Sequence, residues 1–464
     1  MSQAVIEIAA AHRERMREAG MPEVAIRAFL RALDYVRSGG ETLVPEAALE
    51  PVGDLPHAET LAEYREAGHA ALPQTVVIKL NGGLGTSMGL SEAKSLLPAR
   101  NGESFLDLIA RQILWLREDR RSTLPLLLMN SFRTREASLE ALARHSGLQG
   151  AFPLDFLQHR VPRVRVEDAL PVSWPARPDL EWCPPGHGDL YPALQSSGLL
   201  DRLRAEGIRY AFVSNADNLG GVLDLPILGW FASGGIPFAM EVAARTVADK
   251  KGGHLARRDG RLILRESAQC AEADRGAFQD VDRHRYFNTN NLWVDLEALA
   301  ARLEQEPDGL PLPVIRNEKT IEPGDPGGSR CLQLETAMGA AIGCFDGAQA
   351  ICVSRERFAP VKTTNDLLTL WSDAYEMTAD ARVRAVDPEA LRRLEVDLDG
   401  RFFGTVEGLS QRFPKGAPSL SKCRRFSVEG DHRFGADVAV VGDVRLVNPS
   451  EEPVVIASGT VLGG

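Results

Sequence analysis

Two periodicities of apolar and polar residues alternate along the central part of the chain. Short, mostly β-branched or leucine-rich runs predict buried strands at residues 76–80, 124–129, 156–157 and 210–213. Apolar residues at helical spacing predict helices between them, at residues 105–116 and 133–143. Because strands that alternate with helices form parallel sheets covered on both faces, the pattern predicts an α/β fold with a mixed, mostly parallel sheet flanked by helices.

The two ends of the chain have other patterns. Residues 2–38 predict two helices separated at Gly20 and Pro22, and residues 43–73, rich in Pro, Glu and Ala, predict a connector packed against a larger body. After a predicted linker helix at 384–394, short β runs recur between turns, at residues 426–428, 438–441, 444–447, 454–456 and 460–462. Such spacing predicts a parallel β-helix coil, with a small irregular sheet as the alternative. We therefore expect an N-terminal helical segment over 1–73, a central α/β domain over 74–380 and a C-terminal β domain over 381–464.

A glycine-rich loop follows the first predicted strand. Residues 80–89 are Leu-Asn-Gly-Gly-Leu-Gly-Thr-Ser-Met-Gly, and Lys94 comes shortly after them. Glycine lets backbone approach a ligand closely, and successive N–H groups in such a loop form a concave site for phosphate oxygens. The loop is neither a P-loop nor a dinucleotide fingerprint, because Met88 stands where each pattern needs a glycine. It predicts a phosphate site in which Lys94 supplies the positive charge.

Polar side chains follow the other predicted strands. They are Asn130-Ser-Phe132, then Gln158, then Asp217 between Asn215 and Asn218, and a second glycine-rich loop, Pro184-Pro-Gly-His-Gly-Asp189, leads towards a helix. Ligands of open α/β sheets bind beyond the carboxyl ends of the strands. A carboxylate flanked by amides suits a hard cation that bridges phosphates. These loops are expected to meet at one site.

Composition narrows the partners and the compartment. A net charge of −11 argues against a nucleic-acid or anionic-membrane surface, so phosphates must be held by local lysines and backbone amides. The six cysteines have no C-x-x-C spacing, which favours reduced thiols over disulfides or zinc. Glu7 and Arg13 interrupt the region where a signal peptide needs its apolar core, and no apolar run has the length of a membrane span. We expect a cytoplasmic protein.

In combination, these stretches resemble the eukaryotic-type UDP-glucose pyrophosphorylase (UTP–glucose-1-phosphate uridylyltransferase) family. The resemblance rests on residues 80–89 with Lys94-Ser-Leu96, the four strand-end motifs, and later stretches at 251–253 (Lys-Gly-Gly), 287–293 (Phe-Asn-Thr-Asn-Asn-Leu-Trp), 333–341 and 355–364. It covers roughly residues 76–375. One departure is Glu92-Ala93, where the family usually has Gly-Pro before the loop lysine. Ser87-Met88 separates the loop from that of acetylhexosamine pyrophosphorylases, which has Arg-Leu there.

The resemblance implies a Rossmann-like nucleotidyltransferase type A fold with a C-terminal left-handed parallel β-helix. It implies a reversible reaction of UTP with glucose-1-phosphate that gives UDP-glucose and pyrophosphate and depends on Mg²⁺. By family match Lys94, Lys362 and Asp217 are the catalytic residues, and Asp217 holds the metal. The nucleotide is expected at Leu80, Asn81, Gly82, Gly83, Gln158, Gly188 and Asn215. The sugar and its phosphate are expected at His187, Gly253, Glu266, Asn288 and Asn291.

Other functions fit part of the pattern. Gly85-Thr-Ser87-Met-Gly89 matches the G-x-S-x-G elbow of serine hydrolases, which would make Ser87 a nucleophile. A UDP-sugar pyrophosphorylase of broader sugar range is a closer alternative, since residue types do not decide between epimeric sugars. A catalytically inactive scaffold is disfavoured, because the candidate lysines, Asp217 and the glycines of the loop are all present. We expect a monomer, with self-association through the C-terminal domain as the alternative.

Overall fold

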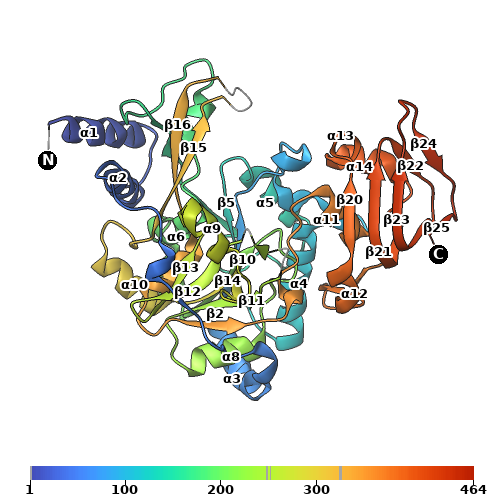
Figure 1. Ribbon diagram of the computed structural model, residues 1–464. Coiled ribbons are helices and arrows are strands. Elements are labelled where there is room, and N and C mark those ends of the chain that lie inside the picture. Colours follow the sequence, from blue (N-terminus) through green and yellow to red (C-terminus); the bar gives the residue numbers. More distant parts are fainter. Residues whose placement is uncertain (1–2, 247–248, 251, 323–326, 464) are drawn as a thin grey trace.

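A ten-stranded mixed sheet forms the centre of the molecule (Figure 1). The computed structural model describes residues 3–246, 249–250, 252–322 and 327–463. The strands are β1 (Glu50–Pro51), β12 (His254–Arg258), β14 (Tyr286–Asp295), β10 (Tyr210–Asn215), β2 (Thr75–Asn81), β5 (Leu126–Asn130) and β6 (Asp155–Leu157) in that spatial order, with β11 (Phe238–Ala244), β13 (Arg261–Arg265) and β17 (Gln349–Cys352) pairing off this path. The α/β class is confirmed, and all four predicted strands are present.

The parallel part of the sheet brings four loops to one edge. Strands β10, β2, β5 and β6 run parallel, and their register pairs Leu80 with Asn215, Asn81 with Asn130, and Asn130 with Leu157. Their carboxyl ends therefore lie side by side. The glycine loop and the motifs at Asn130, Gln158 and Asp217 therefore follow adjacent strands, whereas the second glycine-rich loop follows β9 (Trp182–Cys183), which lies outside this sheet.

Helices cover both faces of the sheet because successive side chains of a strand point in opposite directions. In β2, Val77 packs in one apolar core while Val76 and Ile78 pack in the other. The first core contains α4 (Phe105–Arg120) and α8 (Leu225–Ser233), and the second contains α6 (Leu190–Ser196), α7 (Leu199–Ala205) and α10 (Leu296–Gln305). Helix α5 (Arg135–Ala143) follows β5 as predicted. No helix in the described part of the chain is long and apolar enough to cross a membrane.

The two predicted N-terminal helices are confirmed. Helix α1 (Gln3–Glu18) ends before Gly20, whose φ is 73°, and α2 (Glu23–Arg37) begins after Pro22. They pack on a hairpin of β15 (Val314–Thr320) and β16 (Arg330–Thr336) that projects from the body in Figure 1. The connector after them is more structured than expected, because it contains β1 and a short helix, α3 (Arg65–Ala71).

The C-terminal part consists of two parallel sheets. β20 (Glu395–Leu398), β21 (Ser419–Glu429), β23 (Ala439–Val447) and β25 (Val461–Gly463) form one, and β22 (His432–Phe434) with β24 (Val454–Ile456) forms the other. The runs at 438–441 and 444–447 are one strand, which passes through Gly442. The linker helix is shorter than predicted: residues 383–385 form β19 (Val383–Ala385), which pairs with β18 (Tyr375–Met377), and α12 (Pro388–Arg393) follows.

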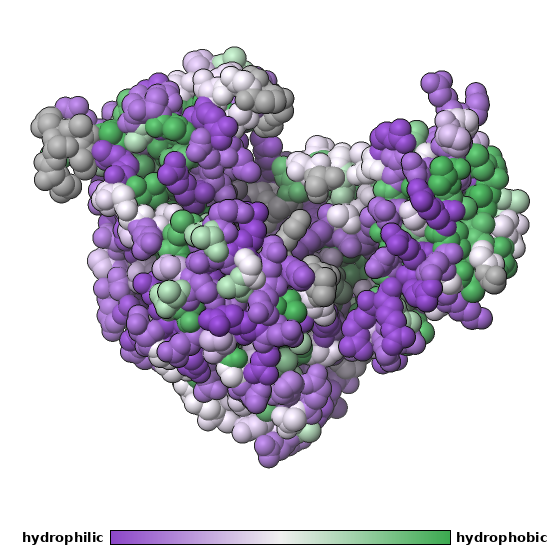
Figure 2. Space-filling model, viewed as in Figure 1, coloured by the Kyte–Doolittle hydropathy of each residue, from purple (hydrophilic) through white to green (hydrophobic). Residues whose placement is uncertain are grey.

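Shorter elements complete the described chain. They are β3 (Pro98–Arg100), β4 (Glu103–Ser104), β7 (Val161–Pro162), β8 (Val164–Arg165), β9 (Trp182–Cys183), α9 (Arg275–Phe278), α11 (Thr364–Trp371), α13 (Gly400–Phe403) and α14 (Val406–Arg412). The space-filling view shows a hollow between the central body and the C-terminal part (Figure 2).

Candidate functional site

The glycine loop is closed by hydrogen bonds at its two ends. The buried Asn81 amide donates to Asn130 Oδ1 at 2.7 Å and to Ser138 Oγ at 2.8 Å, and its oxygen accepts from the Ser95 hydroxyl. The Lys94 N–H donates to the Gly83 carbonyl at 3.2 Å. Asn81 was predicted at the nucleotide, but its side chain faces the protein interior. It shapes the loop from behind because it joins the loop's first and last residues.

Glycine at position 82 leaves room for the Gln158 side chain. A Cβ atom there would lie 2.6 Å from Gln158 Oε1, closer than such atoms approach without displacement. The Gln158 side chain therefore lies directly over the backbone of the glycine loop. Its own backbone N–H donates to the Asn130 carbonyl at 2.8 Å, which fixes it to the neighbouring strand.

Lys94 and Asp217 form an ion pair across the site. Lys94 Nζ lies 2.6 Å from Asp217 Oδ2, and the two side chains keep 16% and 23% of their surface exposed. Lys94 belongs to the 3-10 turn η6 (Lys94–Leu96), and Asp217 follows β10. The carboxylate is thus held at the strand edge next to the glycine loop, where both charges remain accessible to a ligand.

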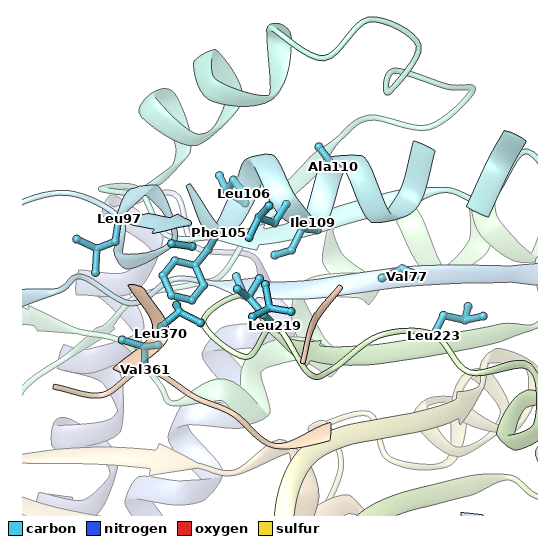
Figure 3. Packing of buried hydrophobic residues seen from close by; sticks show 14 of the residues in the cluster. Val77, Leu97, Phe105, Leu106, Ile109, Ala110, Leu219, Leu223, Val361 and Leu370 are labelled. Carbon is cyan, nitrogen blue, oxygen red and sulfur yellow. The ribbon is translucent and has the colours of Figure 1, made fainter. Parts of the chain in front are cut away.

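One apolar cluster supports the segments that carry these charges (Figure 3). Leu97 follows Lys94 in the chain, Leu219 follows Asp217, and Val361 precedes Lys362, and all three are buried in the same core as Phe105 of α4. Figure 3 shows the Phe105 ring between these segments. Because this core is close-packed, movement of one charged segment is resisted by the others.

Lys362 reaches the same region from far along the chain. The Val361 N–H donates to the Asp217 carbonyl at 3.3 Å, so the Lys362 segment lies against the Asp217 loop. The Lys362 side chain is exposed, and Nζ lies 5.8 Å from the centre of the Phe358 ring. It forms no ion pair with any residue in the described part of the chain. A helix, α11, begins directly after it, where Thr363 and Asp366 form a capping box.

The second glycine-rich loop presents a neutral histidine. His187 Nδ1 accepts a hydrogen bond from the Met338 N–H at 2.9 Å, which leaves the proton of the neutral ring on Nε2. Burial lowers the pKa of His187 to about 4, so the ring stays neutral at physiological pH. A Cβ at Gly188 would lie 2.3 Å from Thr336 Oγ1, which shows how closely this loop approaches β16.

Apart from His187, the predicted sugar-site residues lie in or next to the adjacent strands β13, β12 and β14. His254 pairs with both Arg265 and Phe287, so Gly253, Glu266 and Asn288 are neighbours across the sheet. A Cβ at Gly253 would lie 2.5 Å from Glu266 Oε2, and burial raises the pKa of Glu266. The Asn288 amide donates to Asn290 Oδ1 at 2.8 Å. Lys251, quoted in the motif next to Gly253, lies outside the described residues.

Asn291 was expected to face the sugar, but its side chain is fully buried. Its amide donates to Glu241 Oε2 at 2.9 Å, and Glu241 also accepts two hydrogen bonds from the Arg357 guanidinium, at 2.7 and 2.8 Å. The Asn218 amide contacts both Asn291 and the Arg357 carbonyl. Asn291 therefore belongs to a buried network behind the site that joins the Asp217 loop to the Lys362 segment.

Lys79 was not predicted from the sequence as a site residue. Its ammonium is buried under the loops and donates to Ser214 Oγ at 2.7 Å and to the Gly221 carbonyl. Burial, and after it the Arg357 guanidinium, lower the pKa of Lys79 to about 7, against the opposing effect of the Glu241 and Asp217 carboxylates. In the sequence, the only indication of this role is that Lys79 is the single charged residue in the apolar run at 76–80.

The serine-hydrolase alternative lacks its structural context. A nucleophile elbow is a sharp turn from a strand directly into a helix. Here β2 ends at Asn81, residues 86–88 form the 3-10 turn η5 (Thr86–Met88), and the next α-helix, α4, begins only at Phe105. In the described residues, no group of three or more His, Cys, Asp or Glu side chains could by itself hold a metal ion. Asp217 keeps 23% of its side-chain surface exposed.

The chain is similar in structure and in sequence to known proteins. A variant of the UDP-glucose pyrophosphorylase from Leishmania major, solved in complex with UDP-glucose, superimposes with a TM-score of 0.91 at 42% sequence identity and covers 100% of this chain and 98% of that one. A structure titled UDP-glucose phosphorylase from Trypanosoma brucei gives a TM-score of 0.87 at 43% identity and covers 98% of each chain. The UTP–glucose-1-phosphate uridylyltransferase of Astragalus penduliflorus is 40% identical over 392 residues, 84% of this chain and 81% of its own.

The family model agrees over nearly the same length. The model described as UTP–glucose-1-phosphate uridylyltransferase matches residues 31–440, which includes the glycine loop, the strand-end loops and the Lys362 segment. A match over most of the chain, with relatives at about 40% identity, establishes the family. The chain belongs to the UTP–glucose-1-phosphate uridylyltransferase family.

Proposed function

We propose that this chain catalyses the reversible conversion of UTP and glucose-1-phosphate into UDP-glucose and pyrophosphate. The observation that carries the proposal is the Lys94–Asp217 pair beside the glycine loop, at the carboxyl edge of four parallel strands. This arrangement suits a polyphosphate and its cation rather than an acyl or hydride transfer. The family membership supports it.

The uridine nucleotide is proposed to bind over the glycine loop. The backbone of Leu80, Gly82 and Gly83 and the Asn215 strand end would surround it, and the Gln158 amide would pair with the uracil edge. Gln158 can offer both a donor and an acceptor, and it already lies against Gly82. Gly188 would close the other side. Asn81 acts from behind, by holding the loop.

The sugar phosphate is proposed to bind between the second glycine-rich loop and β12–β14. The His187 Nε2–H would donate to its phosphate or to a hydroxyl, since Nδ1 is occupied by Met338. Glu266 and Asn288 would contact the hydroxyls, and Gly253 would leave room for them. We assign Asn291 to positioning, because its side chain is fully buried and its amide donates to Glu241.

Asp217 fits a Mg²⁺ site of the kind that nucleotides complete. Mg²⁺ commonly takes one or two carboxylates together with substrate phosphates and water, which matches one accessible carboxylate beside a phosphate loop. Bound there, the ion would neutralise phosphate charge. Lys94 now occupies the carboxylate, and a bound cation would free its ammonium for the phosphates.

In the transfer step, a phosphate oxygen of glucose-1-phosphate forms a bond to the α-phosphorus of UTP. The bond from that phosphorus to the oxygen bridging it to the β-phosphate breaks, and pyrophosphate leaves in line on the opposite side. The chain contributes position and positive charge through Lys94 and Lys362, without a covalent intermediate.

A coupled assay that detects UDP-glucose or pyrophosphate tests the proposal. UTP should be strongly preferred over ATP and GTP, because a site that pairs the uracil edge leaves its polar groups unpaired with a purine. A panel of sugar-1-phosphates compares glucose with galactose and other sugars, which separates a strict enzyme from a broader UDP-sugar pyrophosphorylase. Equal turnover of the three nucleotides would contradict the role of Gln158.

For the architecture we propose three domains, with boundaries near residues 73 and 380, and a nucleotidyltransferase type A fold at the centre. The parallel C-terminal sheets favour a left-handed β-helix. We propose a monomer whose self-association, if it occurs at high concentration, uses the end of this domain. Exposed apolar side chains at this end favour it as the contact surface (Figure 2); they are Val447, Val454, Val455 and Val461.

A further inference from the structure

A buried pair of side chains joins the two loops proposed to hold the uridine. Asp189, directly after Gly188, accepts the backbone N–H of His159 at 2.6 Å through one carboxylate oxygen. Its other oxygen lies 2.8 Å from Nδ1 of the His159 ring. His159 directly follows Gln158, and His159 and Asp189 are only 7% and 5% exposed. One carboxylate thus holds both the backbone and the ring of the residue next to Gln158.

The third partner of this chain is Ser196. His159 Nε2 lies 3.0 Å from Ser196 Oγ, and Ser196 is the last residue of α6. Because Asp189 offers only acceptors, the ring donates to it through Nδ1, and Nε2 faces the serine hydroxyl. The ring is held at both nitrogens, while α6 begins beside Asp189 and ends at Ser196.

A Ser–His–Asp chain is also the arrangement of serine hydrolases, in which N–H groups beside the serine stabilise an oxyanion. Ser196 stands at the carboxyl end of a helix, where backbone carbonyls rather than N–H groups are exposed. Hydrolases need preorganised donors at the developing negative charge. The chain Asp189–His159–Ser196 therefore holds structure together and does not perform acyl chemistry.

We infer that Asp189 and His159 are positioning residues that set the nucleobase selectivity of the enzyme. The inference rests on the proposed function, in which Gln158 and Gly188 lie on two sides of the uridine. These loops are separated in the chain, and a short ladder between the strands next to them, β7 and β9, brings them together. Beyond that ladder, the Asp189–His159 pair joins the loops beside Gln158 and Gly188 themselves, which holds the Gln158 amide at one place against the uracil edge.

The expected effect is on the base, not on the sugar. Displacing a positioned group by about 1 Å can cost on the order of 10²-fold in rate, and a relaxed Gln158 would discriminate less between pyrimidines. Asp189→Asn and His159→Ala should raise KM for UTP about tenfold and lower the preference for UTP over CTP by a similar factor. KM for glucose-1-phosphate should stay within twofold. His159→Asn keeps a donor close to the Nδ1 position and should recover most of the preference.

Ser196→Ala is the matched control. It removes the contact at the other ring nitrogen, and because Ser196 is exposed, water can replace its hydroxyl. All kinetic constants should stay within twofold. A preference is a ratio measured on one sample, so partial unfolding of a variant does not alter it.

Calorimetric titration of each protein with UTP and with CTP separates the two hypotheses. If wild-type protein binds UTP selectively but makes no UDP-glucose, the proposed reaction is wrong, and the variants still test the pair through their UTP to CTP affinity ratio. If Asp189→Asn and His159→Ala lose activity with an unchanged UTP to CTP ratio and an unchanged KM for UTP, the pair is only structural and the inference is overturned. Absence of selective UTP binding by the wild type would overturn both.

Discussion

Removal of the Lys94 ammonium should increase the affinity of Asp217 for a metal ion and, at the same time, lower kcat strongly. At the observed 2.6 Å, two unit charges attract by about 6 kcal/mol at an effective dielectric constant of about 20. Most of this is offset by lost hydration. The side chains keep 16% and 23% of their surface exposed, so a net value of about 1–2 kcal/mol is reasonable, slightly above that of fully exposed pairs.

Lys94→Met converts that net value into a change in cation affinity. A metal ion that binds Asp217 without nucleotide must first displace the ammonium, which lowers its apparent affinity. Loss of about 1.4 kcal/mol of competition corresponds to about tenfold tighter binding. Titration with Mn²⁺, followed by electron paramagnetic resonance of the free ion, measures this in the absence of UTP. The same variant should lose about 10²–10³-fold in kcat, because a preorganised cation at the phosphates is missing.

Two variants serve as controls for this experiment. Lys362→Met removes a cation that is not paired with Asp217, so it should lower kcat while leaving Mn²⁺ affinity unchanged. Asp217→Asn should abolish the binding and lower kcat heavily, with a nearly unchanged Tm. Equal Mn²⁺ affinity of wild type and Lys94→Met would refute the competition between ammonium and metal.

Three further predictions concern other parts of the chain. Lys362→Ala should lose about 10²–10³-fold in kcat at an unchanged Tm. Lys362→Arg should recover only part of the rate, because a planar guanidinium cannot occupy the point position of an ammonium. Near-wild-type rates of the alanine variant would show that Lys362 is a surface residue without a role in catalysis. Gly82→Ala should raise KM for UTP because its Cβ would lie 2.6 Å from Gln158 Oε1, and steady-state kinetics at varied UTP measure this, with no change contradicting the close contact. Burial lowers the pKa of His12 to about 4 from 6.5, so the unfolded chain takes up the proton first and stability falls as pH drops from about 6.5 towards 4. Between pH 7.5 and 5, the titration of His12 should lower the free energy of unfolding by about 2 kcal/mol. The His12→Gln variant should therefore show a smaller drop in Tm over that range than the wild type.

The amino-acid sequence alone determined the strands and loops that build the site. Runs such as residues 76–80 are apolar and β-branched over a few consecutive positions, and glycines follow directly, so strand and loop are both local properties. The rule that ligands lie beyond the carboxyl ends of parallel strands then places Lys94, Gln158 and Asp217 on one edge. The β2–β10 and β2–β5 registers confirm that these strand ends are adjacent.

Which polar side chains face the ligand was decided only by the tertiary structure. Asn81 and Asn291 match the family's motifs, but both turn inward, because Asn130 and Ser138 in one case and Glu241 in the other satisfy their amides. Lys79 lies under the site for the same kind of reason, since its acceptors are Ser214 in β10 and Gly221 in the loop after that strand. Periodicity reports the local conformation of a segment, whereas a buried polar group takes its direction from whichever distant segment completes its hydrogen bonds. That partner is known only once the chain is folded.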